Sequence, residues 1–268
     1  MTVLAPAARW CEALRAAADR PPARPRQPLW WESECIGSVE PDLFARAGLA
    51  GAALVRACEQ DGARGWRVQG ALDEALAQLA RTLHERGLAH VWRDEQLAVR
   101  GAAGATLATI ERAAVRPLGI ATHAVHLAAV DEAGRHWVQQ RAFDKATDPG
   151  RWDTLVGGMV PACDGVEEAL ARETWEEAGL RLAQVRGLRH GGRTVTRRPS
   201  RELPHGYVVE TIDWYTCTLP PQALPANQDG EVAGFRAMEP AEVVDRLEAG
   251  EFTVDAALVL LAAFGAPA

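Results

Sequence analysis

The sequence predicts an α/β protein in which a mixed sheet lies between helices and is preceded by a small α+β domain. Three observations lead to this prediction. Some segments alternate apolar and polar residues or are apolar throughout, as strands are. They are interleaved with segments whose spacing predicts amphipathic helices. The 268 residues exceed a typical single domain. The pattern also changes near Gly119, where longer apolar segments begin. We therefore expect an accessory α+β domain over residues 1–115 and a second domain over residues 116–268.

The first domain is predicted to begin with a helix. Residues 5–20 repeat apolar positions at helical spacing, and the proline-rich stretch 20–28 that follows predicts a linker. Further along, we expect a helix at residues 74–86 and strands at residues 35–39 and 91–99. None of these segments carries a recognisable catalytic pattern, so the sequence leaves the role of this domain open.

The second domain is predicted to alternate strands and helices. An apolar strand at residues 120–130 is followed by the hairpin turn 132–135. Further strands are expected at residues 136–141, 154–160, 207–219 and 232–238, and helices at residues 165–178, 240–249 and 254–264. This order favours an α/β sandwich built on a mixed sheet.

The composition limits the class of partner. No apolar run is long enough to cross a bilayer, and a net charge of −7 argues against nucleic acid. The five cysteines are scattered and form no CxxC pair, which argues against a disulfide framework or a zinc site. The N-terminal segment lacks the pattern of a secretory signal. We therefore expect a cytoplasmic protein with a small-molecule partner, and the choice between monomer and homodimer stays open.

The segment from residue 158 to residue 180 carries the chemistry. Glu173, Glu176 and Glu177 are spaced so that their carboxylates project from one face of the predicted helix, where they repel one another unless a cation lies among them. Hard oxygen ligands of this kind suit Mg²⁺ or Mn²⁺. The three glutamates alone leave a solvated acidic helix face as the alternative.

Both ends of this helix have signals of their own. Asp164 is expected to cap the N-terminus, with Glu167 completing a capping box, and Gly179 is expected to end the helix in the left-handed conformation.

The whole segment resembles the Nudix box: a glycine, five residues, an acid, seven residues, then Arg-Glu-x-x-Glu-Glu-x-Gly and an apolar residue. The resemblance implies a Nudix α/β/α sandwich in which Glu173, Glu176 and Glu177 are catalytic metal ligands. It also implies that Gly158 brings its backbone close to the metal and that Arg172 orients a glutamate.

This chain departs from the box at two positions. Asp164 stands where the family has glutamate, which puts its role as a metal ligand in doubt, and Thr174 stands where an aliphatic residue is usual.

The resemblance extends to residues 92–95, 110–114, 123–126, 145–153 and 227–235. In these segments the chain is similar to a Nudix subfamily with an extra N-terminal domain, related to the Nudix part found fused to thiamine pyrophosphokinase. Members of that group are associated with removing a phosphate from damaged thiamine diphosphate. The resemblance thus implies Mg²⁺-dependent hydrolysis of a diphosphate linkage, in oxidised or damaged thiamine diphosphate analogues.

Three alternatives remain. The chain could be a nucleoside diphosphate-X hydrolase, an enzyme like isopentenyl diphosphate isomerase, or a non-catalytic Nudix ligand sensor. Aliphatic Val156 opposes the isomerase, which places its catalytic cysteine near this position, and the retained glutamates oppose the sensor.

Five further residues are substrate-site or catalytic candidates. Lys145, the only lysine among 29 Lys and Arg residues, lies with Arg141 and Asp153 on the segment that leads into the box. Glu231 precedes a strand at a position where many Nudix enzymes have an additional catalytic acid, with a surface turn as the alternative reading. His126 is either a ligand contact or a hydrogen-bonded core histidine.

A thiamine-like ring predicts a particular kind of pocket. We expect apolar or aromatic walls, for which these tryptophans are candidates: Trp92, Trp137, Trp152 and Trp214.

Overall fold

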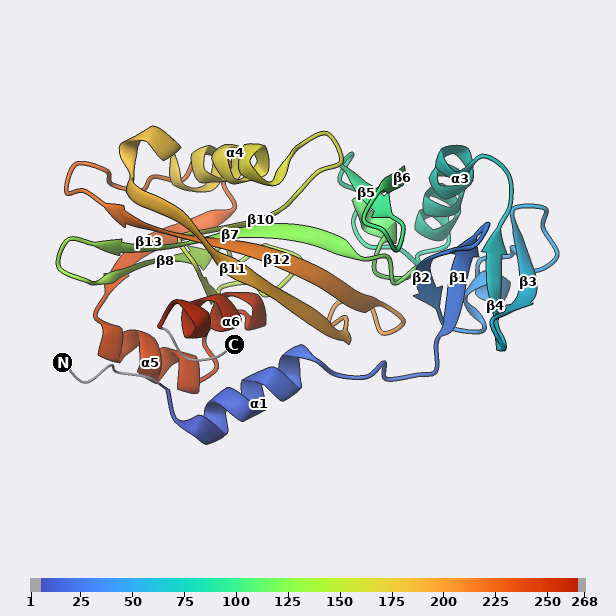
Figure 1. Cartoon of the computed structure of the whole chain (residues 1–268), viewed down its shortest axis with the longest axis horizontal. Helices are drawn as coiled ribbons and strands as arrows, with labels where there is room; N and C mark the ends of the chain where they lie inside the picture. Colours follow the sequence, from blue (N-terminus) through green and yellow to red (C-terminus); the bar gives the residue numbers. More distant parts are fainter. Residues whose placement is uncertain (1–5, 265–268) are drawn as a thin grey trace.

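The structure, a computed structural model, describes residues 6–264, so the expected helix start at residue 5 lies outside the described residues. Three sheets organise this part of the chain: a four-stranded sheet, a two-stranded sheet and a seven-stranded sheet. Figure 1 shows the four-stranded sheet at one end of the molecule, the seven-stranded sheet at the other, and the two-stranded sheet between them. No helix within residues 6–264 is long and apolar enough to span a membrane.

The N-terminal part is built around helix α3 (Leu72–Glu85). The apolar face of α3, with Leu76, Leu79 and Leu83 fully buried, packs into a core shared with the strands. The four-stranded sheet has the order β2-β1-β4-β3. Its elements and their neighbours are β1 (Gln27–Trp31), β2 (Glu34–Val39), α2 (Leu43–Arg46), β3 (Val55–Gln60), β4 (Ala63–Val68), β5 (Gln96–Arg100), β6 (Thr106–Glu111) and the short 3-10 helix η1 (Arg112–Ala114).

The C-terminal part is a three-layer sandwich around the seven-stranded sheet. Strand β12 pairs in parallel with β7 and antiparallel with β11, so the sheet is mixed, as predicted. Figure 1 shows α4 over one face and α5 and α6 over the other. The elements are β7 (Thr122–Asp131), β8 (His136–Arg141), β9 (Trp152–Asp153), β10 (Val156–Met159), α4 (Val166–Ala178), η2 (Leu182–Gln184), β11 (Arg186–Pro199), β12 (Tyr207–Leu219), β13 (Val232–Met238), α5 (Pro240–Glu248) and α6 (Val254–Ala263).

The first helix, α1 (Ala8–Ala18), packs on the C-terminal part. Its buried residues Cys11, Leu14 and Ala18 belong to the same core as α6. Figure 1 shows α1 below α6 and far from α3. We therefore propose that the accessory part, predicted as residues 1–115, is built from residues 27–115, with α1 serving the second part.

The sequence patterns missed some strands. Strand β5 begins at Gln96 rather than at residue 91, because Trp92 donates to Asp94 Oδ1 at 2.7 Å and Asp94 takes a positive φ of 56°. The arginine-rich stretch 186–199, which no strand pattern marks, is the edge strand β11, and it pairs along β12. Here cross-strand pairing overrides a local composition rich in glycine and charge.

Candidate active site

Helix α4 has the predicted position but a different N-terminal cap. Gly165 is the N-cap residue, and its N–H donates to Glu168 Oε2 at 2.7 Å. The predicted cap by Asp164 and Glu167 is wrong, because Asp164 accepts a hydrogen bond from Arg172 Nε at 2.9 Å instead. The predicted C-terminal end is confirmed, since Gly179 takes a left-handed φ of 62°.

The three box glutamates differ in their exposure. Glu177 is only 2% exposed, whereas the side chain of Glu176 is 41% exposed and that of Glu173 is 13% exposed. Glu177 Oε2 accepts hydrogen bonds from Gln139 Nε2 at 2.8 Å and from the Gly157 N–H at 2.9 Å. The expectation of one exposed acidic face is therefore wrong for Glu177, which lies against the sheet.

Arg172 holds the neighbouring carboxylates in place. Its Nη1 lies 3.0 Å from Glu173 Oε1 and 2.7 Å from Glu176 Oε2. Its Nε contacts Asp164, as above, and these carboxylates raise the pKa of Arg172 although burial opposes them. Arg172 thus contacts two of the box glutamates, and its orienting role stays a prediction.

Burial also raises the pKa of two of these carboxylates. Burial raises the pKa of Glu177 to about 8, with a further contribution from Glu173 and opposition from the Gly157 N–H. Burial likewise raises the pKa of Glu173 to about 7, against the lowering effect of Arg172. Acidic side chains buried together in this way favour a bound cation, because its charge offsets both desolvation and mutual repulsion.

The backbone of β10 leaves room for one of these carboxylates. A Cβ on Gly158 would lie 2.0 Å from the carboxyl carbon of Glu173, so only glycine lets this side chain lie against the strand. Within residues 6–264, no three His, Cys, Asp or Glu side chains already form a metal-binding group. The residue types and this glycine cradle nevertheless fit a hard divalent cation.

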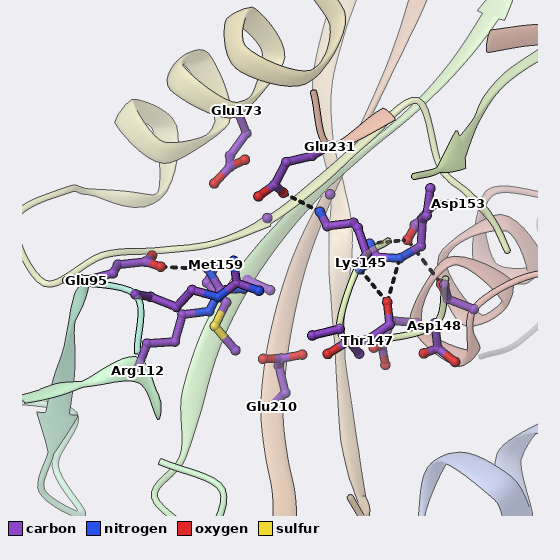
Figure 2. Close-up of a pocket in the computed structure, with 18 of the residues that line it drawn as sticks. Glu95, Arg112, Lys145, Thr147, Asp148, Asp153, Met159, Glu173, Glu210 and Glu231 are labelled. Carbon is purple, nitrogen blue, oxygen red and sulfur yellow. Dashed lines mark hydrogen bonds and ion pairs between the residues drawn. The ribbon is translucent and has the colours of Figure 1, made fainter. Parts of the chain in front are cut away.

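Lys145 and Glu231, 86 residues apart, meet in the same pocket. Lys145 Nζ donates to Glu231 Oε2, and Figure 2 shows this pair facing Glu173. Burial alone would raise the pKa of Glu231, but the hydrogen bond and charge of Lys145 outweigh it and lower that pKa. Both residues line the pocket.

Arg141, Asp153 and His126 also line this pocket. Arg141 Nη1 lies 3.4 Å from Asp153 Oδ2, and its Nη2 donates to the Thr147 carbonyl at 2.9 Å. His126 Nδ1 lies 2.8 Å from Thr154 Oγ1. His126 is thus a buried, hydrogen-bonded histidine that also lines the pocket.

The pocket has a volume of about 320 Å³ and charged walls. No tryptophan is among the described residues that line it, so Trp92, Trp137, Trp152 and Trp214 do not form its walls. Sequence reasoning missed two ion pairs there: Arg116 Nη2 lies 3.0 Å from Glu210 Oε2, and Arg198 Nη2 lies 3.1 Å from Asp255 Oδ2. Their partners are 94 and 57 residues apart, and no local motif joins them.

The raised pKa values predict how stability depends on pH without divalent cations. Between the ordinary value of 4.5 and the folded values of about 7 and 8, folded Glu173 and Glu177 hold more protons than they do in the unfolded chain. Raising the pH through this window therefore destabilises the folded state. In EDTA, we expect the melting temperature of Glu177→Gln to rise relative to that of the wild type as the pH increases from about 5.5 to about 8.5.

Thermal melts of both proteins at the two pH values measure this effect. Adding Mg²⁺ at the higher pH should raise the melting temperature of the wild type more than that of the variant. A difference between the two proteins that does not change with pH would contradict the assignment of a buried, proton-holding Glu177.

Comparisons with known proteins find one family model and several related sequences. The model of the NUDIX domain matches residues 121–258. The chain is 29% identical over 195 residues to the chloroplastic Nudix hydrolase 24 of Arabidopsis thaliana, covering 71% of this chain and 52% of that protein. It is 30% identical over 144 residues to the isopentenyl-diphosphate Delta-isomerase of Streptomyces coelicolor, covering 53% of this chain and 70% of that protein.

Among solved structures, the crystal structure of DR0079 from Deinococcus radiodurans aligns with a TM-score of 0.49 and 23% identity, covering 62% of this chain and 98% of that one. The chain spans about half the length of two matched plant relatives, 52% and 48%.

Proposed function

The chain belongs to the Nudix family, whose model matches more than half of it, and from this membership we propose that it hydrolyses a diphosphate linkage in a small molecule with the help of Mg²⁺. The observation that carries the proposal is the position of the α4 carboxylates: Glu177 is buried and Glu173 lies against Gly158, in a pocket that also presents cationic side chains.

The residues divide the proposed reaction among them. Glu173, Glu176 and Glu177 would hold the metal, with the Gly158 backbone beside it. When bound, Mg²⁺ supplies charge neutralisation for the diphosphate and a water of lowered pKa (Mn²⁺ would supply the same). Arg172 keeps Glu173 and Glu176 in place through the contacts described above.

The opposite wall would act on the substrate. Lys145 and Arg141 are proposed to bind phosphate oxygens, with Asp153 orienting Arg141. Water attacks phosphorus in line with the leaving oxygen, and its proton is proposed to pass to a carboxylate, Glu177 or Glu231. The products are a monophosphate and either inorganic phosphate or a second monophosphate.

We propose a thiamine-type substrate, preferably with an oxidised or damaged ring. Support comes from the chain-wide resemblance to the thiamine-related subfamily and from the pocket, whose volume of about 320 Å³ is at the small end for ligand sites. The carboxylates Glu210 and Asp255 each have an arginine partner. These acids are therefore already paired and would not offset the cost of desolvating a cationic thiazolium. A neutral ring has no such cost.

A kinetic comparison tests the substrate. With Mg²⁺ at one pH, we expect kcat/KM to be higher for oxothiamine diphosphate than for thiamine diphosphate, and lowest for ADP-ribose and dNTPs. Equal values for the two thiamine compounds would show that ring charge is not sensed. A preference for ADP-ribose would remove the thiamine-type substrate and favour a nucleoside diphosphate-X hydrolase.

The similarity to the Streptomyces isomerase favours one second candidate, isomerisation of isopentenyl diphosphate. Val156 opposes it, because this residue is aliphatic and fully buried, and it does not line the pocket. Isomerisation releases no phosphate, so adding isopentenyl diphosphate to the same panel separates the two activities. A non-catalytic sensor would bind the diphosphates and cleave none.

A further inference from the structure

The N-terminal part contacts the box directly. The Ala162 N–H, in the loop that precedes α4, donates to the Gln96 carbonyl of β5 at 2.7 Å. Met159, at the end of β10, packs against the N-terminal core. These contacts place the β5–β6 hairpin and η1 beside the glutamates, so this part of the chain forms one side of the pocket.

One arginine on that side of the pocket differs from its neighbour in its hydrogen-bond partners. Arg112, the first residue of η1, donates from Nη1 to Glu95 Oε2 at 2.6 Å. Within the described chain Glu95 is its only side-chain hydrogen-bond partner, although a guanidinium has five N–H donors. By contrast, Arg116 donates to both Thr122 and Glu210.

The backbone around Arg112 is fixed. Its own N–H donates to the Glu95 carbonyl at 2.9 Å, and the next residue, Ala113, accepts from the His90 N–H at 3.0 Å. Buried Glu111 caps η1 by accepting from the Ala113 N–H at 3.4 Å and also accepts from the Arg93 N–H at 2.9 Å. Because the backbone of Arg112 and one end of its guanidinium are already held, the side chain loses little further conformational freedom when it binds an anion.

Arg112 also faces the reacting end of the pocket. Figure 2 shows Arg112 and Glu95 on one side and Lys145 on the other, with Glu173 and Glu210 between them. Burial raises the pKa of Glu173, and the charge of Arg112 is among those that lower it, as it is for Glu231. A diphosphate on the acidic face would thus have Lys145 at one side and Arg112 at the other.

We propose that Arg112 is a substrate-binding residue that holds the diphosphate through its free N–H donors, with Glu95 as its positioning residue, so that the N-terminal part completes the active site. This inference rests on the proposed function. It assigns the N-terminal part a direct role in binding the anionic substrate, whereas a merely structural Arg112 would only join η1 to β5.

Binding of imidodiphosphate, which carries two phosphates and no ring, tests the proposal by calorimetry on the full chain with Mg²⁺. We expect Arg112→Ala to weaken binding about tenfold or more and Arg112→Lys to restore part of the loss, because lysine keeps the charge without the planar fork. Arg100→Ala is the matched control, since this arginine lies on the same hairpin but bonds Gly104 and Thr106, away from the pocket.

The outcomes separate the inference from the function. Wild-type affinity in Arg112→Ala, or an equal loss in Arg100→Ala, would overturn the role of Arg112 and leave the proposed hydrolysis standing. Absence of both binding and hydrolysis in the wild-type chain would overturn the proposed function and this inference with it. Glu95→Gln should weaken binding less than Arg112→Ala does, since it loosens the guanidinium without removing it.

Discussion

Replacing Glu177 by glutamine is expected to remove nearly all hydrolysis and to leave the fold intact. The amide is the size of the carboxylate, and its oxygen can still accept from Gln139 Nε2 or from the Gly157 N–H. What disappears is the negative charge that would bind the metal and take up a proton. Such a loss should lower kcat by about 10²-fold or more.

The measurement is kcat for the best diphosphate of the panel, together with a thermal melt. Glu167→Gln is a matched control, because it makes the same change on an exposed residue in the first turn of α4, outside the pocket. A Glu177→Gln variant with nearly wild-type kcat would refute the assignment of Glu177.

The second large effect is expected from Gly158→Ala. The new Cβ would lie 2.0, 2.3 and 2.4 Å from the carboxyl carbon and the two oxygens of Glu173, so that side chain must turn away. Moving the end of a flexible side chain costs little stability, but it takes a metal-binding carboxylate out of position. Because misplacement of about 1 Å at a reacting centre costs about 10²-fold, we expect a loss of that order in kcat.

Gly234→Ala controls for the loss of a strand glycine. A Cβ at Gly234, on β13, would meet no atom within 4 Å. This variant should keep its activity, and both variants should melt near the wild-type temperature. If Gly158→Ala turned over normally, Glu173 would not need its place against β10, and the geometry of the proposed metal site would be wrong.

Local sequence patterns predicted the elements that have a clear apolar periodicity or a clear end signal. Strands β8, β12 and β13 have the expected bounds, and α4 ends at Gly179 as expected. The fold class follows from these elements, because their order leaves few ways to cover one mixed sheet.

The rest depends on contacts between distant residues. Glu177 is buried because Gln139 and Gly157 approach it from the sheet, and helical spacing alone cannot report that. The pairing of Lys145 with Glu231 joins positions 86 residues apart. Arg112 lay within a segment of family resemblance, but only the packing of the β5–β6 hairpin against the box loop places it in the pocket.

Hydrolysis in ¹⁸O-labelled water tests the central claim most directly. The wild-type enzyme would be incubated with Mg²⁺ and each compound of the diphosphate panel, isopentenyl diphosphate included. The mass of each phosphate-containing product would then be measured by mass spectrometry. Attack of water at phosphorus predicts one ¹⁸O in one of the two phosphate-containing products, with no product in EDTA and about 10²-fold less or lower still with Glu177→Gln. Cleavage that leaves every phosphate unlabelled, or isomerised isopentenyl diphosphate with no cleavage of any compound, would contradict the account.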